Sequence, residues 1–361
     1  MKILLIGEFS NVHATLAEGL RRLGHTVTVA SDGDAWKNYP RDIDLSRKKG
    51  TWGGCLLMLK IARLLPTWRH YDVVQIISPM FLPLKAERNF LVYKYLRKHN
   101  RKVFLGVNGN DWYVINACCT TMPLRYSDFN RGTELIDNEY TQETRNVWMG
   151  TIREKMTKQM YQSVNGIIPG LYEYWACCKD VFPQKTRFIP YPITPLPPTL
   201  RPQSSKLRLF IGISKQRSAY KGTDIMLKAA QDILKKYPQQ VELKVAEGVP
   251  FEQYQQMMDD SDVLLDQLYS YTPAMNALLA MSKGMIVVGG GEPENYEILG
   301  ETELRPIINV EPNYESVYHE LEQLVLHPER IPELKQQSIE YIKKHHDYVK
   351  VAMQYVDFWN R

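Results

Sequence analysis

The chain has 361 residues, of which 44% are hydrophobic and 24% charged, and its formal net charge is +5. These proportions are typical of a globular protein of about two domains and exclude a disordered or collagen-like chain. No apolar run of about 18 residues occurs, and the apolar start at 1–7 is too short for a signal peptide. We therefore expect a cytoplasmic protein whose five cysteines, which lack zinc-site spacing, are free thiols.

The first half of the chain alternates predicted strands and helices. An apolar strand over 1–7 is followed by a turn, a helical pattern that Gly24 ends, and a second strand over 25–30. A strand, a helix and a strand within about 30 residues predict a βαβ unit with parallel strands. Further strands are predicted over 72–77, 103–107, 166–169 and 187–190, with a basic helix over 84–99.

Six prolines between Pro190 and Pro202 predict a stiff linker, after which the alternation restarts. The later strands are predicted over 207–212, 241–246, 261–266 and 284–288, with helices over about 223–237 and 274–283 and one long helix in the last 27 residues. We predict an α/β fold of two Rossmann-like, doubly wound domains with a cleft between them. The domains span 1–195 and 196–339, and the C-terminal helix, about 340–361, packs back onto the first.

Three segments of the second half predict a site for the diphosphate of a nucleotide sugar. The loop 212–222 carries an arginine and a lysine after a strand, and the helix 274–283 offers free amides and a favourable dipole at its start. The glycines of 289–294 allow close approach of a ligand, and a carboxylate follows them. The alternatives are a solvated basic loop, an ordinary buried helix and a loose acidic loop. The predicted donor-binding residues are Arg217, Lys221, Ala274, Met275, Asn276, Gly290, Gly291 and Glu294.

These segments resemble a known enzyme family. The loop 212–222, the Ala-Met-x-x-Gly pattern of 280–284 and the Gly-Gly-x-Pro-Glu loop of 290–294 are similar to those of retaining GT-B glycosyltransferases, the large family that includes many bacterial lipopolysaccharide and capsule enzymes. The resemblance implies a glycosyltransferase of surface polysaccharide or glycoconjugate synthesis. Such an enzyme takes a nucleotide-diphosphate sugar as donor substrate, uses no cofactor or metal, and transfers the sugar with retention to a glycan or polyprenyl-linked acceptor.

The chain departs from the family at one pair of positions. The family carries two glutamates eight residues apart, where this chain has Tyr271 and Leu279. The roles of those glutamates, contact with the transferred sugar and a clamp on the ribose, are therefore not carried over. Asp266, Asn276 or Glu294 are the candidates to replace them, and a non-catalytic homologue is an alternative.

The first half predicts the acceptor side of the site. In the family a histidine or aspartate at the end of the corresponding strand lies beside the reacting sugar, and Asp111 resembles it; the alternative is a turn residue that caps the next helix. His13, in the loop and helix start after the first strand, is the second catalytic candidate, and its alternative is also a structural role. The predicted acceptor-binding residues are Glu8, Ser10, Asn11 and Asn110.

Charge is distributed unevenly along the chain. Residues 1–195 hold 27 basic and 17 acidic side chains, residues 196–361 hold 18 and 23, and the block 45–102 holds 13 and 2. Within this block an apolar segment over 56–65 has positive flanks, which predicts either peripheral contact with an anionic membrane or a core-facing helix with solvated lysines. The block lacks the pattern of a known nucleic-acid module, so no nucleic-acid partner is predicted.

Two Asp-x-Asp patterns, at 32–34 and 42–44, have the spacing of metal-dependent glycosyltransferases. We predict no metal site there, because both lie outside the half that carries the donor signals. A nucleotide-sugar epimerase of the same architecture remains the main alternative function. A dinucleotide-dependent oxidoreductase is disfavoured because Gly7 stands alone after the first strand, where that class needs a Gly-x-Gly-x-x-Gly pattern.

Overall fold

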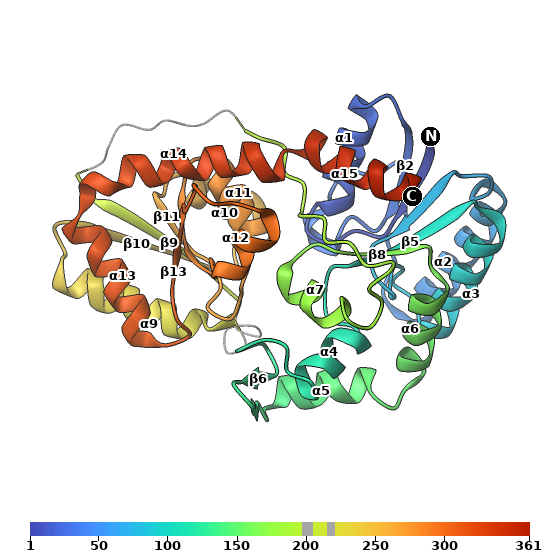
Figure 1. Ribbon diagram of the computed structural model, residues 1–361, viewed down its shortest axis with the longest axis horizontal. Helices are drawn as coiled ribbons and strands as arrows, with labels where there is room; N and C mark the ends of the chain where they lie inside the picture. Colours follow the sequence, from blue (N-terminus) through green and yellow to red (C-terminus); the bar gives the residue numbers. More distant parts are fainter. Residues whose placement is uncertain (197–204, 215–220) are drawn as a thin grey trace. The chain divides into compact units, whose positions relative to one another are not determined.

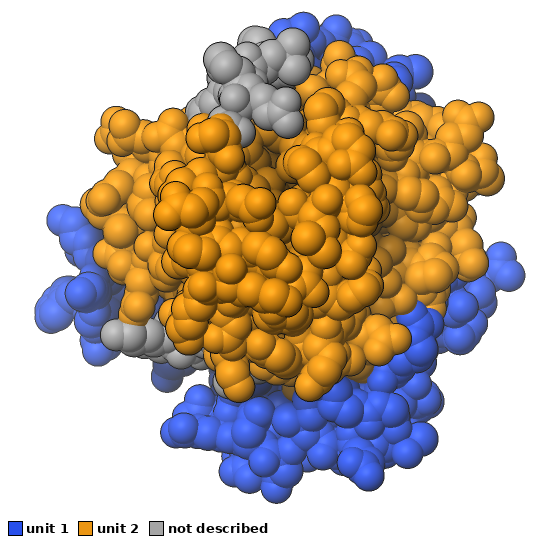
Figure 2. Space-filling model, turned by 90° about the vertical axis from the view of Figure 1, so that its left-hand side faces the viewer, with its two compact units in different colours: residues 1–125, 129–192, 348–361 blue, residues 126–128, 193–347 orange. Residues whose placement is uncertain are grey.

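The computed structural model describes residues 1–196, 205–214 and 221–361, and it divides the chain into two compact units. Unit 1 comprises residues 1–125, 129–192 and 348–361, and unit 2 comprises 126–128 and 193–347 (Figure 2). Each unit is built around its own parallel sheet, with helices on both faces (Figure 1). The α/β class and the two doubly wound domains predicted from the strand-helix alternation are thus confirmed.

The sheet of unit 1 has six parallel strands in the order β3-β2-β1-β4-β5-β8. Its strands are β1 (Lys2–Ile6), β2 (Thr26–Ser31), β3 (Ile43–Asp44), β4 (Val73–Ile76), β5 (Lys102–Val107) and β8 (Gly166–Pro169). Its helices are α1 (Val12–Arg22), α2 (Gly50–Leu64), α3 (Ala86–His99), α4 (Trp112–Cys119), α5 (Glu139–Trp148), α6 (Ile152–Ser163), α7 (Tyr172–Cys178) and α15 (Tyr348–Asn360). A short hairpin joins β6 (Asn130–Arg131) to β7 (Glu134–Leu135).

Helix α15, the last of the chain, packs against α1, which is among the first (Figure 1). Val351, Ala352 and Trp359 join the core that also holds Ile3 and Leu16. The two helices approach closely, since a Cβ at Gly19 would lie 2.3 Å from the carbonyl oxygen of Tyr348. A side chain larger than hydrogen at this position would therefore separate the two ends of the chain.

The sheet of unit 2 has five parallel strands in the order β10-β9-β11-β12-β13. Its strands are β9 (Leu207–Ile213), β10 (Val241–Glu247), β11 (Val263–Leu265), β12 (Ile286–Gly289) and β13 (Ile307–Asn309). Its helices are α9 (Thr223–Lys236), α10 (Phe251–Asp259), α11 (Met275–Ser282), α12 (Pro293–Leu299), α13 (Tyr314–Leu326) and α14 (Ile331–Tyr341). Its core consists of apolar side chains from the sheet packed against α9, α13 and α14.

Two predicted elements were wrong. The last 27 residues do not form one helix: a π-helical turn over Ile342–His346 follows α14, and Asp347 then leaves the helical region with φ −53° and ψ 123° before α15 begins. The segment 187–190 runs beside β8 and its Arg187 donates to the carbonyl of Ile167, but only a bridge between Ile167 and Thr186 forms. Ile189 also donates to the carbonyl of Pro169 at 3.3 Å, but Pro169 has no N–H to donate in return, so a full ladder cannot be made.

Candidate functional site

The carboxyl ends of β1 and β2 carry a buried polar cluster in unit 1. Gly7 ends β1 with φ +84°, and a Cβ there would lie 2.4 Å from the side chain of Ile77, so the chain turns where only glycine fits. Glu8 follows it and is buried. Its carboxylate accepts the backbone N–H groups of His13 at 3.2 Å and Ala14 at 2.8 Å, so it caps α1 from the preceding loop.

Burial changes the ionisation of both Glu8 and His13. Desolvation raises the pKa of Glu8 to about 8, against the opposing effect of the N–H groups that it accepts, and the nearby Asp34 raises it further. Desolvation lowers the pKa of His13 to about 4. Both groups therefore favour their neutral forms near pH 7.

The geometry selects one tautomer of His13. Its Nδ1 lies 2.8 Å from the carbonyl oxygen of Gly7, and a neutral imidazole can bond to that acceptor only by donating from Nδ1. Its Nε2 is then an acceptor, and this buried atom has no hydrogen-bond partner among the described residues. An unsatisfied buried acceptor of this kind is a position where a ligand hydroxyl can donate a hydrogen bond.

The other residues predicted on the acceptor side lie in the same loop or near it. Ser10 and Asn11 both have left-handed backbones, with φ of 52° and 74°. The backbone N–H of Ser10 donates to Asp34 at 2.8 Å, and Lys37 donates to both Asp34 and the Ser10 hydroxyl. The Oδ1 atom of Asn11 is buried and has no partner within the described part of the chain. Two more buried side-chain oxygens, of Ser78 after β4 and Asn108 after β5, have no hydrogen-bond partner among the residues that the structure describes.

Asp111 has a structural role in unit 1. It is the N-cap of α4, and its Oδ1 accepts the backbone N–H groups of Tyr113 at 2.9 Å and Val114 at 3.1 Å. Its Oδ2 accepts the hydroxyl of the buried Tyr161. Burial raises the pKa of Asp111 to about 6. Both carboxyl oxygens are thus engaged inside the unit, which favours the capping interpretation over the catalytic one. Asn110, next to it, donates to the hydroxyl of Tyr140 at 3.0 Å.

In unit 2 the segments predicted to bind the donor lie at one edge of the sheet, where its strands end. They meet there because β9, β11 and β12 are neighbours in a parallel sheet and have their carboxyl ends on the same side. The carbonyl of Lys221 accepts the backbone N–H of Leu268 at 2.8 Å, which joins the loop after β9 to the loop after β11. Arg217, the other basic residue predicted there, lies outside the described residues. The proline-rich linker is described only up to residue 196.

A chain of hydrogen bonds at this edge involves Asn276, in the first turn of α11. Its amide donates to Asp266 at 3.1 Å, and its carbonyl oxygen accepts the hydroxyl of Tyr254 at 3.1 Å. Burial raises the pKa of Asp266, while Lys221 acts in the opposite direction. The side chain of Asn276 is therefore used within the unit. The helix begins after Ala274, and no side-chain cap is formed among the described residues, so the amides of its first turn, with that of Met275, provide the features expected of an anion site.

The glycine loop after β12 packs tightly against unit 2 itself. A Cβ at Gly290 would lie 2.2 Å from the carbonyl oxygen of Ser270, and one at Gly291 would lie 2.8 Å from the side chain of Ile307. The packing of the loops is thus sufficient to require both glycines, whether or not a ligand also approaches them. Glu294, predicted to bind the donor, lies half-buried in the first turn of α12.

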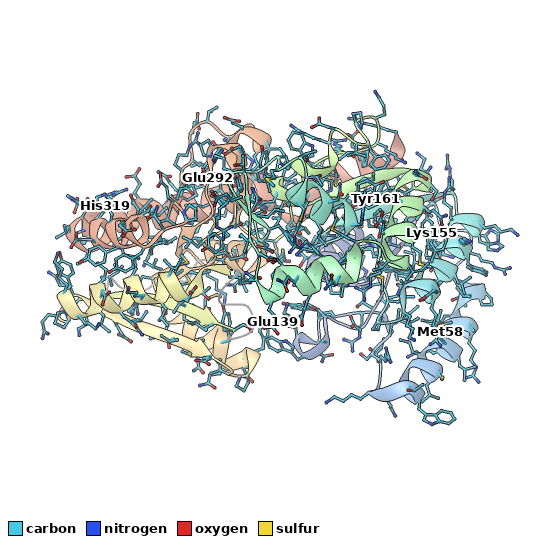
Figure 3. All side chains as sticks on the ribbon, turned by 90° about the horizontal axis from the view of Figure 1, so that it is seen from below. Met58, Glu139, Lys155, Tyr161, Glu292 and His319 are labelled. Atoms are coloured by element: carbon cyan, nitrogen blue, oxygen red, sulfur yellow. The ribbon has the colours of Figure 1, made fainter. Side chains whose placement is uncertain are left out.

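The position of Tyr271, where the resembling family has a glutamate, holds an aromatic and carboxylate cluster. The ring of Tyr271 is buried and lies 4.7 Å from that of Tyr126, centroid to centroid. The hydroxyl of Tyr126 donates to Oε1 of the buried Glu292 at 2.5 Å. Figure 3 labels Glu292 within this part of the fold. Leu279, at the second glutamate position, is half-buried on α11.

Sequence reasoning missed two members of this cluster. Glu292 is the variable residue of the Gly-Gly-x-Pro-Glu pattern, and the available signal was an acid one position before a proline that can begin a helix. Tyr126 carried no signal. It lies 166 residues before Glu292, and only the tertiary fold brings it into unit 2.

The described residues form neither a metal-binding cluster nor a membrane-spanning helix. Among the described residues, no three side chains of histidine, cysteine, aspartate or glutamate lie close enough together to bind a metal ion. The predicted Asp-x-Asp acids are engaged with basic groups: Asp34 pairs with Lys37, and Asp42 with Arg21. Across 1–196, 205–214 and 221–361, no helix combines the length and hydropathy that a membrane span requires.

Each unit is a parallel sheet covered by helices, and this arrangement defines the fold of the chain. The chain has the GT-B fold, two Rossmann-like domains in succession, as seen in glycosyltransferases and in UDP-GlcNAc 2-epimerases. No protein-family model matches the sequence, and no curated protein sequence matches it either.

Solved structures match the fold over the whole chain. Sucrose-phosphate synthase from Thermosynechococcus elongatus is 12% identical, with a TM-score of 0.62, and the match covers 100% of this chain and 98% of that one. Anabaena HepE in complex with UDP and glucose is 11% identical, with a TM-score of 0.59 and coverage of 99% and 98%. A putative UDP-N-acetylglucosamine 2-epimerase from Listeria monocytogenes is 11% identical, with a TM-score of 0.56 and coverage of 98% and 94%.

Proposed function

We propose that the chain is a glycosyltransferase that moves a sugar from a nucleotide-diphosphate sugar to a hydroxyl group of a glycan or polyprenyl-linked acceptor. Its place is in the synthesis of surface polysaccharide or glycoconjugates. The observation that carries the proposal is the edge of unit 2 where Lys221 and the start of α11 lie beside the half-buried Asp266. Solved glycosyltransferases, one of them in complex with UDP, share the fold that forms this edge.

On this proposal the diphosphate of the donor binds at the carboxyl ends of β9 and β11. The first amides of α11 point their N–H groups toward an anion, and the ammonium of Lys221 adds a point charge. Burial raises the pKa of Asp266 and Lys221 acts in the opposite direction, so the lysine ammonium lies close enough to offset the charge of that carboxyl group at this edge. Arg217 is proposed as a second phosphate ligand because of its residue type and its position in the loop.

Glu292 is proposed to provide the carboxylate that Tyr271 does not. It lies at the start of α12, it is buried, and the hydroxyl of Tyr126 holds its Oε1. A carboxylate fixed in this way can accept hydrogen bonds from sugar hydroxyls without losing much side-chain entropy on binding. Glu294 is two residues further along the chain and half-buried, and it is the second candidate for the same contact with a sugar hydroxyl.

His13 is proposed as the group that receives the hydrogen bond of the acceptor hydroxyl. It is neutral near pH 7, its Nδ1 is held by the carbonyl of Gly7, and its Nε2 has no partner within the described residues. A lowered pKa makes His13 a weak base, so it orients the hydroxyl rather than removing its proton completely. This accords with a retaining transfer in which the departing phosphate takes the proton, as the family resemblance implies.

The test is turnover of labelled nucleotide sugars with and without glycan or polyprenyl-diphosphate acceptors. A glycosyltransferase forms a glycosylated acceptor and releases the nucleoside diphosphate only when an acceptor is present. The main alternative, an epimerase, is favoured by the match to the Listeria 2-epimerase fold and would convert the nucleotide sugar with no acceptor. Absence of thermal stabilisation by any nucleoside diphosphate would contradict both readings, because a ligand raises stability according to its affinity and concentration.

A further inference from the structure

Helix α2 (Gly50–Leu64) of unit 1 is apolar on two faces. The inward face carries Leu57 and Ile61, which are buried. A core-facing helix needs no more than this face, yet the outward face is also apolar. Trp52, Leu56 and Leu59 are 81%, 52% and 57% exposed. In Figure 3 the helix that carries Met58 lies at the margin of the drawing, and its side chains extend away from the other elements of unit 1.

The exposed residues form one stripe. Trp52, Leu56, Leu59 and Arg63 follow one another at spacings of four, three and four residues, which places them on the same side of a helix with 3.6 residues per turn. All four are exposed. The stripe is too apolar to be explained as a solvated helix surface, and exposed apolar patches of this kind mark interaction sites.

Basic side chains border this stripe. Lys48 and Lys49 are exposed directly before α2, and Lys60 is exposed on the helix beside Arg63. The surrounding block 45–102 has 13 basic residues and 2 acidic ones, and both acids lie outside α2, at Asp72 and Glu87. An occupant of the stripe must therefore have an apolar interior and a negatively charged surface.

We infer that the outward face of α2 is a docking surface for an anionic lipid bilayer. Trp52, Leu56 and Leu59 enter the boundary between headgroups and acyl chains, and the flanking lysines and Arg63 bind the anionic headgroups. A second copy of this chain fits less well, because it would bring an equally basic block against the first. A nucleic acid would satisfy the charges but would leave the two leucines exposed. This inference gives the proposed acceptor a location, yet its test does not depend on transferase activity.

The experiment is sedimentation of the full chain with vesicles. One set contains phosphatidylcholine with phosphatidylglycerol, and the other contains phosphatidylcholine alone. We expect binding to the anionic vesicles at low salt and its loss at high salt, since screening shortens the range of the attraction. Emission of the Trp52 indole should shift to the blue on binding, and the shift should be absent in Trp52→Phe.

Variants separate the apolar and electrostatic contributions. We expect Leu56→Ser with Leu59→Ser to weaken binding by about tenfold or more, while Leu326→Ser, at a residue equally exposed in unit 2, leaves it unchanged. Replacing Lys48 and Lys49 by alanine should weaken binding by about fivefold per lysine at low salt, whereas Lys235→Ala should not. Melting temperatures of all variants show that the fold is intact.

Four outcomes would overturn the inference. They are equal binding to neutral vesicles, binding that ignores salt, full binding by the double leucine variant, and concentration-dependent dimers that the same variant abolishes without any vesicle binding. A fifth outcome, retention of RNA in place of vesicles, would also overturn the inference and assign the basic block to nucleic acid. Failure of the donor-site proposal would appear separately, as absence of stabilisation by nucleoside diphosphates.

Discussion

Replacing Glu8 with glutamine removes an ionisable carboxyl group that the fold buries beneath the start of α1. Glutamine has nearly the same shape and keeps an oxygen that can accept the N–H of Ala14, which the carboxylate accepts at 2.8 Å. The change therefore tests ionisation with little change in packing. Its effect depends on pH, because burial raises the pKa of Glu8 from 4.5 to about 8.

The sign follows from proton linkage. A carboxyl group whose folded pKa is raised binds its proton more tightly in the folded state, so the unfolded state loses that proton first as the pH rises. The wild-type protein should therefore lose stability, relative to Glu8→Gln, from about pH 4.5 up to about pH 8. At about 1.4 kcal/mol per pKa unit, the difference should grow by roughly 3 kcal/mol between pH 5 and pH 8.

The assay is denaturant unfolding of both proteins at several pH values, with the difference in unfolding free energy plotted against pH. Taking the difference cancels the contributions of groups that do not interact with Glu8. Glu18→Gln, on the exposed side of the same helix, controls for the loss of a charge. A difference that stays constant from pH 5 to pH 8 would show that the N–H groups of His13 and Ala14 outweigh burial, and would refute the argument for a neutral Glu8.

Four further predictions address the two candidate edges. Lys221→Ala should weaken binding of UDP or of another preferred nucleoside diphosphate by about tenfold or more, measured by titration calorimetry, whereas the matched Lys235→Ala should not; equal affinities would remove Lys221 from the donor site. Tyr126→Phe leaves the buried Glu292 without its hydroxyl donor and should cost roughly 1–3 kcal/mol of unfolding free energy, and a double-mutant cycle with Glu292→Gln should give a coupling energy clearly different from zero. Asp111→Asn should lower stability through the lost Tyr161 contact and leave the transfer rate nearly unchanged, while a large rate loss with normal stability would restore its catalytic role. Transfer should continue in EDTA, because the proposed donor contacts are Lys221 and backbone amides, and loss of activity that Mg²⁺ restores would contradict this.

Several features of the fold followed from local sequence patterns. Strands and helices alternate because apolar residues recur with the periods of the two elements, and parallel sheets follow from strand-helix-strand succession. The turn at Gly7 and the end of α1 before Gly24 also depend on residues close together in the chain. The C-terminal helix was predicted as one piece, because its apolar period continues through the turn at Asp347 where the backbone leaves the helix.

Other features depended on the tertiary structure. Glu8 and His13 are ordinary polar residues in the sequence, and only burial by the surrounding elements makes both neutral. Tyr126 contacts Glu292, which lies 166 residues later in the chain, and the periodicity of apolar residues carries no information about contacts at that separation. The sequence determined the parallel sheets and the edges at which ligands of such folds bind. The tertiary structure decided which polar atoms at those edges are hydrogen-bonded within the unit and which lack a partner among the described residues, as Nε2 of His13 does. The physical reason is that burial and long-range contacts fix protonation and hydrogen bonding.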